Sequence, residues 1–172
     1  IRNVKGKAIR TRLKDLGVFR KNGQEHLAGC IVAPLADAQG DIVQLYGRRI
    51  DPKAPKERRH LYLARPLAGI FNPEALKSRE IILPESILDA LTFYRHGMEA
   101  VTCIYGTGNF TPQIFDAIKV AKIECVKLAF DGDASGEKAL AKISSKLQAV
   151  GIECHQIKFP WGSDANSFAL DQ

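Results

Sequence analysis

The sequence predicts an α/β protein with a mainly parallel sheet flanked by helices, preceded by a smaller, basic, mixed α+β lobe that carries a β-hairpin. From Arg79 onward, short apolar runs alternate with helical patterns, which is typical of a parallel sheet. Before Arg79, a turn-forming segment separates two apolar runs, as in a hairpin. The charge divides at the same place. Residues 1–78 hold 16 Lys and Arg against 7 Asp and Glu, a net charge of +9, whereas residues 79–172 hold 9 against 12, a net charge of −3.

These observations predict two parts, a basic lobe over residues 1–78 and an α/β domain over residues 79–172. A basic lobe next to an acidic domain suits metal-dependent chemistry on a polyanion, because cations bind phosphates and carboxylates bind the metal. Charge alone is equally compatible with a surface that only keeps the protein in solution. The length of 172 residues suffices for one core plus a smaller lobe without disulfides.

The first lobe is expected to contain one short helix, one hairpin and one basic loop. Residues 9–17 (IRTRLKDLG) have a helical pattern and end on a glycine. Apolar residues at 30–33 and again at 42–46 flank the turn-forming residues 37–40 (DAQG), which predicts the hairpin. Residues 48–59 (RRIDPKAPKERR) combine two prolines with six basic residues, so an exposed, mobile loop is expected.

The second part is expected to alternate strands and helices in the order β-α-β-α-β-α-β. Each strand is a short apolar run, and each helix carries an apolar stripe at helical spacing or ends on a glycine. We expect strands at residues 80–83, 100–104, 125–130 and 152–159, and helices at residues 85–97, 112–121 and 137–151.

Several function classes receive no support from the sequence. No run of about 18 apolar residues occurs and no signal peptide is recognisable, so we expect a cytoplasmic protein without a membrane partner. The four cysteines are far apart and lack zinc-ligand spacing, which favours buried free thiols. The histidines are equally scattered and define no catalytic set with Ser, Cys or Asp.

Carboxylates follow three of the predicted strands. Glu85 follows the strand at 80–83, Asp131 and Asp133 follow the strand at 125–130, and Asp164 follows the strand at 152–159. Ligands of parallel α/β sheets bind at this end of the strands, so the carboxylates are expected to meet at one rim. Asp89 lies four residues after Glu85, on the same face of the predicted helix. Such a group would repel itself unless a hard divalent cation neutralised it.

Each of these features is weak when taken alone. A single pair of acids spaced as in DGD, or four residues apart on a helix, is more often a helix cap or a solvated helix end. Their joint placement at successive strand ends favours the metal site. The glycine between Asp131 and Asp133 is expected to let both side chains turn toward the ion.

Four segments together resemble the signature blocks of Toprim domains. They are LPESILDAL, CIYGTGNFT, LAFDGDASGEKA and FPWGSDANSF, in that order along the chain. They are most similar to the Toprim domains of bacterial-type DNA primases, especially the primase-like proteins of plasmids, phages and integrated elements. The segment GCIVAPLADAQGDIVQLYGRR also resembles the hairpin that precedes Toprim in primases. The resemblance covers about residues 28–172.

The resemblance implies roles for individual residues. Glu85, Asp131 and Asp133 would be catalytic, and the metal ligands would be Glu85, Asp89, Asp131, Asp133 and Asp164, holding Mg²⁺ or Mn²⁺. Arg48 matches the arginine of a basic ridge that holds nucleotide and template. The full expected nucleotide- and DNA-binding set is Arg48, Arg49, Lys53, Lys56, Arg58, Arg59, Gly106 and Thr107.

Two positions depart from the primase pattern. Asn166 stands where primases have a second acid, so one metal is expected to be held less tightly. Leu61 falls at the place of a primase lysine, and Arg58, Arg59 and His60 are the nearby candidates to replace it.

The leading functional hypothesis is the catalytic core of a DNA primase, a nucleotidyltransferase that makes short RNA primers from ribonucleoside triphosphates on single-stranded DNA. Two alternatives stay open: phosphodiester cleavage, as in Toprim nucleases and topoisomerases, and a nucleic-acid-binding module without catalysis. The resemblance also implies a replicative helicase and a zinc-binding domain as partners outside this chain. Without them we expect the chain to start primers poorly and to bind DNA weakly and in a salt-sensitive manner.

Overall fold

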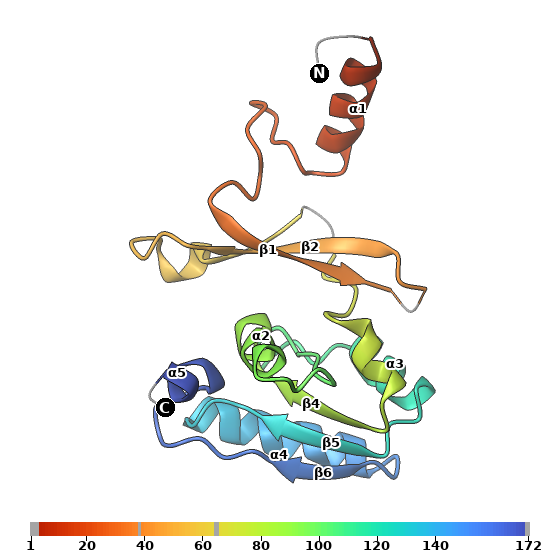
Figure 1. Cartoon of the computed structure of the whole chain (residues 1–172), viewed down its shortest axis with the longest axis vertical. Coiled ribbons are helices and arrows are strands. Elements are labelled where there is room, and N and C mark those ends of the chain that lie inside the picture. The colour runs from red at the N-terminus through yellow and green to blue at the C-terminus, as the bar shows by residue number, and fades with distance from the viewer. Residues whose placement is uncertain (1–3, 38, 64–65, 171–172) are drawn as a thin grey trace. The chain divides into compact units, whose positions relative to one another are not determined.

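The computed structural model describes residues 4–37, 39–63 and 66–170 (Figure 1). The chain forms two compact units, one of residues 1–35 and 41–68, and a second of residues 36–40 and 69–172. Residues 69–78 therefore pack with the second unit. One reason is that Ile70 pairs with Ala36 in an antiparallel bridge, and another is that the Phe71 N–H donates to the Tyr105 hydroxyl at 2.8 Å.

The first unit is a helix followed by a three-stranded sheet. Helix α1 spans Val4–Asp15, so it begins five residues before the helix that the sequence predicts at 9–17. The sheet has the order β1-β2-β3, with β1 at Cys30–Ala36, β2 at Ile42–Arg49 and β3 at His60–Tyr62. The predicted hairpin is present as β1 and β2, and its turn contains a hydrogen bond from the Gly40 N–H to the Asp37 carbonyl at 3.1 Å.

The segment expected as a mobile basic loop is more ordered than the sequence suggests. Strand β2 continues through Arg48 and Arg49, and β3 pairs with it antiparallel, with Arg48 opposite His60. Between the two strands lies a short 3-10 helix, η1 at Lys56–Arg58. The prolines and basic residues predicted exposure but did not reveal that Arg48 and Arg49 extend β2 or that Lys56–Arg58 form a 3-10 helix.

The second unit contains a parallel sheet in the order β4-β5-β6. Strand β4 at Glu80–Pro84 pairs with β5 at Cys125–Ala129, and β5 pairs with β6 at Glu153–Gln156. The helices are η2 at Pro73–Lys77, α2 at Ile87–Arg95, α3 at Pro112–Val120, α4 at Ala134–Gln148 and α5 at Ala165–Leu170.

The strand expected at 100–104 forms only one bridge. Val101 is bridged to Ile82 in the parallel direction, and the Thr102 N–H donates to the Ile82 carbonyl at 3.1 Å. The Ile104 N–H continues the pairing by donating to the Pro84 carbonyl at 3.2 Å. The segment therefore runs beside β4 in the expected place, although it is joined to β4 by an isolated bridge and a few hydrogen bonds and is not a full strand.

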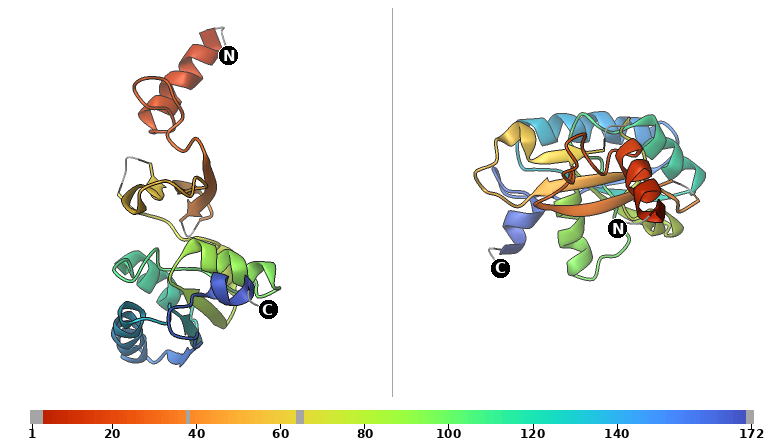
Figure 2. Two further views of the ribbon diagram at one scale, coloured as in Figure 1. Left: turned by 90° about the vertical axis from the view of Figure 1, so that its left-hand side faces the viewer. Right: turned by 90° about the horizontal axis from the view of Figure 1, so that it is seen from above.

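Local sequence explains where the helices begin and which face of the sheet they cover. Ser86, Thr111 and Asp133 each accept a hydrogen bond from an N–H three residues ahead and so cap α2, α3 and α4. Helix α4 begins three residues before the predicted start because of the Asp133 cap. The left-hand view of Figure 2 shows α2 and α5 on one side of the sheet and α3 and α4 on the other.

The core of the second unit lies between these layers. Strand β4 is buried on both faces, with Ile81 and Leu83 fully shielded from solvent. Helices contribute further buried residues through their apolar stripes: Ile87, Ala90, Ile114, Ile118, Ile143 and Leu147. This packing fixes the carboxyl ends of the strands at one rim of the sheet.

Candidate metal and nucleic-acid site

The carboxyl ends of the parallel strands carry the predicted acidic residues. Glu85 directly follows β4, Asp131 lies two residues after the end of β5, and Asp164 directly precedes α5. Asp133 is the N-cap of α4 and Asp89 lies in the first turn of α2, and the N-termini of both helices lie at the same rim. Parallel pairing therefore brings residues from three distant sequence segments to one place.

Asp131 is the electrostatic centre of this group. Burial and, after it, the negative charges of its neighbours together raise the pKa of Asp131 to about 7. Those neighbours are Glu85, Asp89, Asp164 and Asp133, in decreasing order of effect. A carboxyl that senses four other carboxylates lies where a cation is most favoured, because each neighbouring charge opposes its ionisation.

Glu85 is half-buried at the end of β4. Burial raises the pKa of Glu85, a hydrogen bond from the Thr107 backbone partly offsets this, and the charges of Asp133 and Asp89 add to the rise. The Glu85 backbone carbonyl also accepts from the Gly106 N–H at 2.8 Å. The loop after the bridged segment is thus attached to Glu85 by both its main chain and its side chain.

Asp89 is the most buried of the five carboxylates, with 4% of its surface exposed. Its Oδ2 atom accepts a hydrogen bond from the Ser86 hydroxyl at 2.6 Å. Burial raises the pKa of Asp89, the Ser86 bond lowers it, and the charge of Asp164 raises it again. The Asn166 backbone N–H also donates to this carboxylate, so the position that departs from the primase pattern contributes through its main chain.

The other two carboxylates double as helix caps. Asp133 Oδ1 accepts from the Gly136 N–H at 2.7 Å, and Asp164 Oδ1 accepts from the Ser167 N–H at 2.6 Å. Ser167 returns the interaction, because its hydroxyl accepts from the Asp164 N–H at 3.0 Å. Both carboxylates keep their second oxygen outside these caps, so capping and metal binding are compatible.

The Gly106-Thr107 loop borders the carboxylates. Tyr105 and Gly106 adopt left-handed backbone angles, with φ of 63° and 106°. The Tyr105 side chain holds the loop in place by donating to the Gly69 carbonyl at 3.1 Å. Thr107 Oγ1 lies 3.2 Å from the Ser135 hydroxyl on the first turn of α4. The loop therefore spans from Glu85 to the N-terminus of α4.

A cavity of about 360 Å³ adjoins Asp131. Trp161 contributes to its wall with 73% of its surface exposed, and Lys158 adds a cation. The remaining lining residues are Phe130, Asp131, Gly132, Glu137, Leu140, Gln156 and Phe159. A cation, an aromatic face and carboxylates around one hollow suit a phosphorylated, base-containing ligand. Sequence reasoning did not single out Lys158 or Trp161, whose only signal was their place in the segment before Asp164.

In the first unit, Arg48 belongs to a short row of hydrogen-bonded side chains on β2 and β3. Arg48 Nη1 donates to His60 Nε2 at 2.6 Å, and His60 Nδ1 lies 3.0 Å from the Tyr46 hydroxyl. Since a guanidinium can only donate, His60 accepts at Nε2 and carries its proton on Nδ1. Desolvation lowers the pKa of His60, and the charges of Arg48 and Arg59 lower it further.

The other predicted basic residues have different environments. Arg59 Nε donates to the Ala54 carbonyl at 3.0 Å and its Nη2 to the Pro52 carbonyl at 3.3 Å, so this side chain shapes its own loop. Arg49 is half-buried, and its Nε has no hydrogen-bond partner among the residues that the structure describes. Lys53 and Arg58 are exposed, and the Lys56 side chain lies outside the described residues.

The structure thus gathers the acidic set with Gly106 and Thr107 in the second unit, and the basic set in the first unit. Sequence reasoning missed one further group. Cys125, Glu153 and His155 place one ligand atom each within 4.8 Å of the others. Alternation along the two strands would have predicted a shared face, but the register of β5 against β6 was not available from the sequence.

Comparison with known proteins identifies the class. Residues 82–169 match the Toprim-like family model, and the chain belongs to this family. The match runs from within β4 through most of α5, and it includes every carboxylate of the rim.

Particular relatives are DNA primases. The chain is 27% identical over 154 residues to the DNA primase of Chlamydia trachomatis serovar D, covering 83% of this chain and 25% of that protein. It is 29% identical over 150 residues to the DNA primase of Staphylococcus aureus strain COL, covering 80% of this chain and 24% of that protein. The chain therefore spans about a quarter of the length of these relatives.

Solved structures share the fold. The structure of the DnaG catalytic core superimposes with a TM-score of 0.75 at 16% identity, covering 96% of this chain and 56% of that one. The zinc-binding and RNA polymerase domains of the Aquifex aeolicus primase give a TM-score of 0.68 at 22% identity, covering 86% of this chain and 38% of that one. The DnaG primase catalytic domain bound to single-stranded DNA gives a TM-score of 0.71 at 16% identity, covering 99% of this chain and 58% of that one. The mixed α/β architecture predicted from the sequence is confirmed.

Across residues 4–37, 39–63 and 66–170, every helix is too short or too polar to cross a bilayer.

Proposed function

We propose that this chain is the part of a DNA primase that joins ribonucleotides into a primer on a single-stranded DNA template. The observation that carries the proposal is the convergence of four other carboxylates on Asp131 at the rim of a Toprim-like domain. The similarity to DNA primases over four fifths of the chain supports the choice among Toprim activities.

The donor set fits a hard divalent cation. All five side chains offer carboxylate oxygens, the ligands that Mg²⁺ and Mn²⁺ prefer. The raised pKa values of Glu85, Asp89 and Asp131 express mutual repulsion as well as burial, and a cation would relieve that repulsion. When bound, such an ion supplies Lewis-acid polarisation of the reacting phosphate and neutralises the departing pyrophosphate.

The chain's own residues would position the reactants. Glu85 and Asp131 lie next to each other with raised pKa values, and we assign Glu85 as the candidate acceptor of the proton from the attacking 3′-hydroxyl. Lys158 would pair with a phosphate in the adjoining cavity, and Trp161 would stack on a base. Most of the rate would come from this placement and from electrostatics.

The first unit would hold the template and the triphosphate. Arg48, Arg49, Lys53, Lys56, Arg58 and Arg59 supply the cations that a phosphate backbone requires. The pairing of Arg48 with His60 orients the guanidinium without neutralising it, since His60 accepts as a neutral ring. A zinc-binding domain, as named for the Aquifex aeolicus primase, and a replicative helicase would be the protein partners.

A gel of labelled products tests the proposal against both alternatives. The chain is incubated with single-stranded DNA, ribonucleoside triphosphates and Mg²⁺ or Mn²⁺, with and without an annealed RNA primer. Ribonucleotide extension that is absent from Asp131→Asn/Asp133→Asn supports the primase assignment. Shortened DNA would identify a nuclease or topoisomerase activity, and a shifted but unchanged DNA band would identify a binding module.

A further inference from the structure

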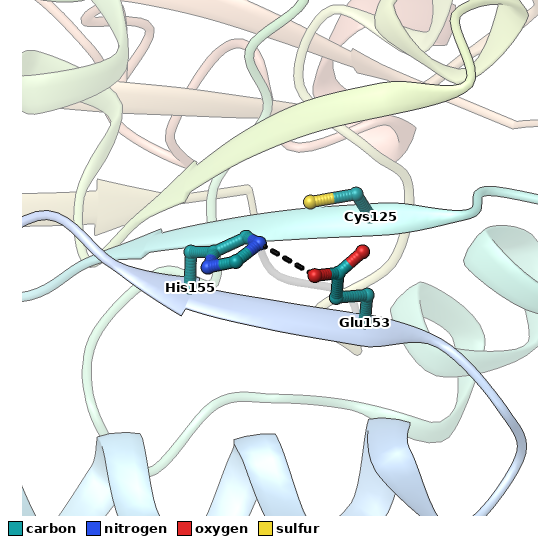
Figure 3. A group of neighbouring side chains, drawn as sticks. All are labelled: Cys125, Glu153 and His155. Carbon is teal, nitrogen blue, oxygen red and sulfur yellow. Dashed lines mark ion pairs between the residues drawn. The ribbon is translucent and has the colours of Figure 1, made fainter.

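A second set of metal-ligand side chains lies at the opposite end of the sheet. Cys125 begins β5, and Glu153 and His155 lie on β6, with Cys125 directly opposite Glu153 in the parallel register. Figure 3 shows the three side chains standing on the same face of the two strands. This face is turned away from α4, because the intervening Cys154 points to α4 and contacts the Ser144 carbonyl at 3.9 Å.

The geometry of the three side chains is close to that of a tetrahedral metal site. Cys125 Sγ, a Glu153 oxygen and a His155 nitrogen all lie within 4.8 Å of one another, and His155 Nε2 is 2.9 Å from Glu153 Oε1. Ligand atoms around tetrahedral zinc lie about 3.3–3.6 Å apart, from metal–ligand bonds of about 2.0–2.3 Å. Side-chain rotations that move the ligand atoms by about an ångström would therefore accommodate an ion, and the backbone register would not change.

The chemistry of this set differs from that of the carboxylate rim. A thiolate, an imidazole and one carboxylate select a borderline cation such as Zn²⁺, whereas the all-oxygen rim suits Mg²⁺ or Mn²⁺. Cys125 and Asp131 are six residues apart along an extended strand, which corresponds to about 20 Å. An ion at Cys125 would not share ligands with the rim.

Neighbouring groups affect the site from β4 and β5. The Cys125 thiol donates to the Glu80 carboxylate, whose Oε1 also binds Lys127 Nζ at 2.6 Å. Glu80 can supply a fourth ligand, while Lys127 is the nearby cation that any metal must compete with. The Glu153 and His155 side chains are 67% and 57% exposed, so an ion has an open path from solvent.

We propose that Cys125, Glu153 and His155 form a binding site for a zinc-type divalent cation, with Glu80 or water as the fourth ligand. Such an ion would join β6, the last strand of the sheet order β4-β5-β6, to β5 at the start of both strands. The site would therefore act on the stability of the sheet edge, independently of catalysis at the rim.

Metal binding at this site must release a proton. Burial raises the pKa of Cys125, and the charges of Glu80 and Glu153 raise it further, so the free thiol is protonated at neutral pH. Formation of the sulfur–metal bond transfers that proton to solvent. Affinity is therefore expected to increase as the pH rises from 6 to 8, at about one proton released per ion bound.

Titration with Co²⁺ tests the site. The buffer contains excess Mg²⁺, which occupies the rim. A cysteine ligand produces a thiolate-to-cobalt charge-transfer absorption, which we expect in the wild-type chain and in Asp131→Asn/Asp133→Asn. Zn²⁺ should displace the Co²⁺ and abolish the absorption. Cys125→Ser should remove the band, and the matched control Cys154→Ser, on the other face of β6, should retain it.

A second variant protects the test against misfolding. His155 is exposed, so His155→Gln is expected to leave the metal-free melting temperature unchanged. It should weaken Co²⁺ binding about 100-fold or more, since losing even an outer partner of a metal ligand costs about 10–100-fold. The proposal is overturned if no charge-transfer band appears in the wild-type chain, or if Cys154→Ser rather than Cys125→Ser removes it. Unchanged affinity in His155→Gln would overturn it equally.

Discussion

Gly132 packs so closely against Pro160 that a methyl group added to Gly132 would lie 2.3 Å from the Pro160 carbonyl oxygen. Two hydrogen bonds complete the contact: the Gly132 N–H donates to the Ser163 carbonyl, and the Gly162 N–H donates to the Gly132 carbonyl, both at 2.8 Å. The loop that carries Asp131 and Asp133 is thus fixed to the loop that carries Asp164. Gly132 is required for this contact between loops, a different reason from the metal access that the sequence suggested.

Gly132→Ala should therefore destabilise the fold. Backbone atoms must move to admit the methyl group, which costs about 1–3 kcal/mol in an over-packed position. For a chain of this size, each kcal/mol lowers the melting temperature by about 2–4 °C. The movement would also separate Asp164 from Asp131, so Mg²⁺ should bind more weakly. Circular dichroism melts with and without Mg²⁺ measure both effects.

Gly108→Ala is the matched control for Gly132→Ala. A methyl group at Gly108 meets no atom within 4 Å, and the backbone there is not left-handed. The free energy of unfolding of this variant should lie within about 0.5 kcal/mol of the wild-type value, as for most surface substitutions. If both glycine variants lose the same stability, the contact with Pro160 is not the cause.

The pKa of Asp131 predicts that the metal-free protein loses stability as the pH rises. An unfolded chain releases this proton near pH 4, whereas the folded chain keeps it until about pH 7. Between these values the folded state binds more protons, so the free energy of unfolding falls with pH and stays low above about pH 7. Asp131→Asn should reduce this dependence, because the amide carries no proton to lose.

Thermal melts at pH 5 and pH 8 in the presence of a chelator check this prediction. Mg²⁺ should restore stability mainly at pH 8, where the rim is ionised. The lowered pKa of His60 works in the opposite sense, since it costs stability below about pH 6, so the comparison is made between variant and wild type. A steeper pH dependence in Asp131→Asn than in the wild type would contradict the assignment of Asp131 as the central carboxyl.

Asp131→Asn/Asp133→Asn should abolish stabilisation by metal. An ion at ten times its dissociation constant adds about 1.4 kcal/mol to the wild type. Asparagine is as good a helix cap as aspartate, so α4 should keep its N-terminus in the double variant. Without metal the double variant should be the more stable protein, because less carboxylate repulsion remains. If metal raised the free energy of unfolding equally in the two proteins, the rim would not be the metal site.

The sequence was sufficient for the parallel sheet and for the position of the carboxylates at its rim. Strand ends are marked by the change from apolar to acidic residues, as at Leu83 to Glu85, and parallel strands place such ends together. Burial and capping were harder to predict. That Asp89 is nearly inaccessible, and that Asp164 caps α5, depend on how α2 and α5 pack, which no local pattern encodes.

Register and close backbone contacts were also beyond the sequence. The group at Cys125, Glu153 and His155 depends on β5 and β6 being aligned residue by residue. Gly136 is a second example, because a methyl group there would lie 2.1 Å from the Asp131 carbonyl oxygen. The sequence predicts a helix that begins only after Gly136, whereas in the structure Gly136 lies in the first turn of α4, where no larger residue would fit against Asp131.

Arg48→Ala should weaken binding to single-stranded DNA or nucleoside triphosphate with little effect on stability. The Arg48 side chain makes one partly exposed hydrogen bond, to His60, whose loss costs at most about 1 kcal/mol. The pKa of His60 should rise in this variant, because the charge of Arg48 helps to hold it down. NMR titration of His60 and fluorescence anisotropy of labelled DNA measure the two effects.

Arg48→Lys separates charge from geometry at this position. It keeps the positive charge near His60 but loses the planar pair of donors that grips a phosphate. We expect intermediate DNA binding and a His60 pKa close to that of the wild type. A variant at Arg48 that melts several degrees lower and binds DNA normally would make the residue structural.

The single tryptophan provides a direct optical test of the rim. Trp161 is exposed and lines the cavity that Asp131 also lines, so an ion held by the carboxylates lies near the indole ring. Mn²⁺, which quenches nearby fluorophores, should lower the Trp161 emission in a saturable manner, and excess Mg²⁺ should reverse the effect by competition. Asp131→Asn/Asp133→Asn should show only weak, linear quenching, because the ion is then free in solution. Cys125→Ser is the matched control. Mn²⁺ should quench its Trp161 emission as in the wild type, since Cys125 is about 20 Å from Asp131 along the strand. Saturable quenching of the same strength in the rim variant would place the ion elsewhere and would separate Trp161 from the proposed catalytic centre.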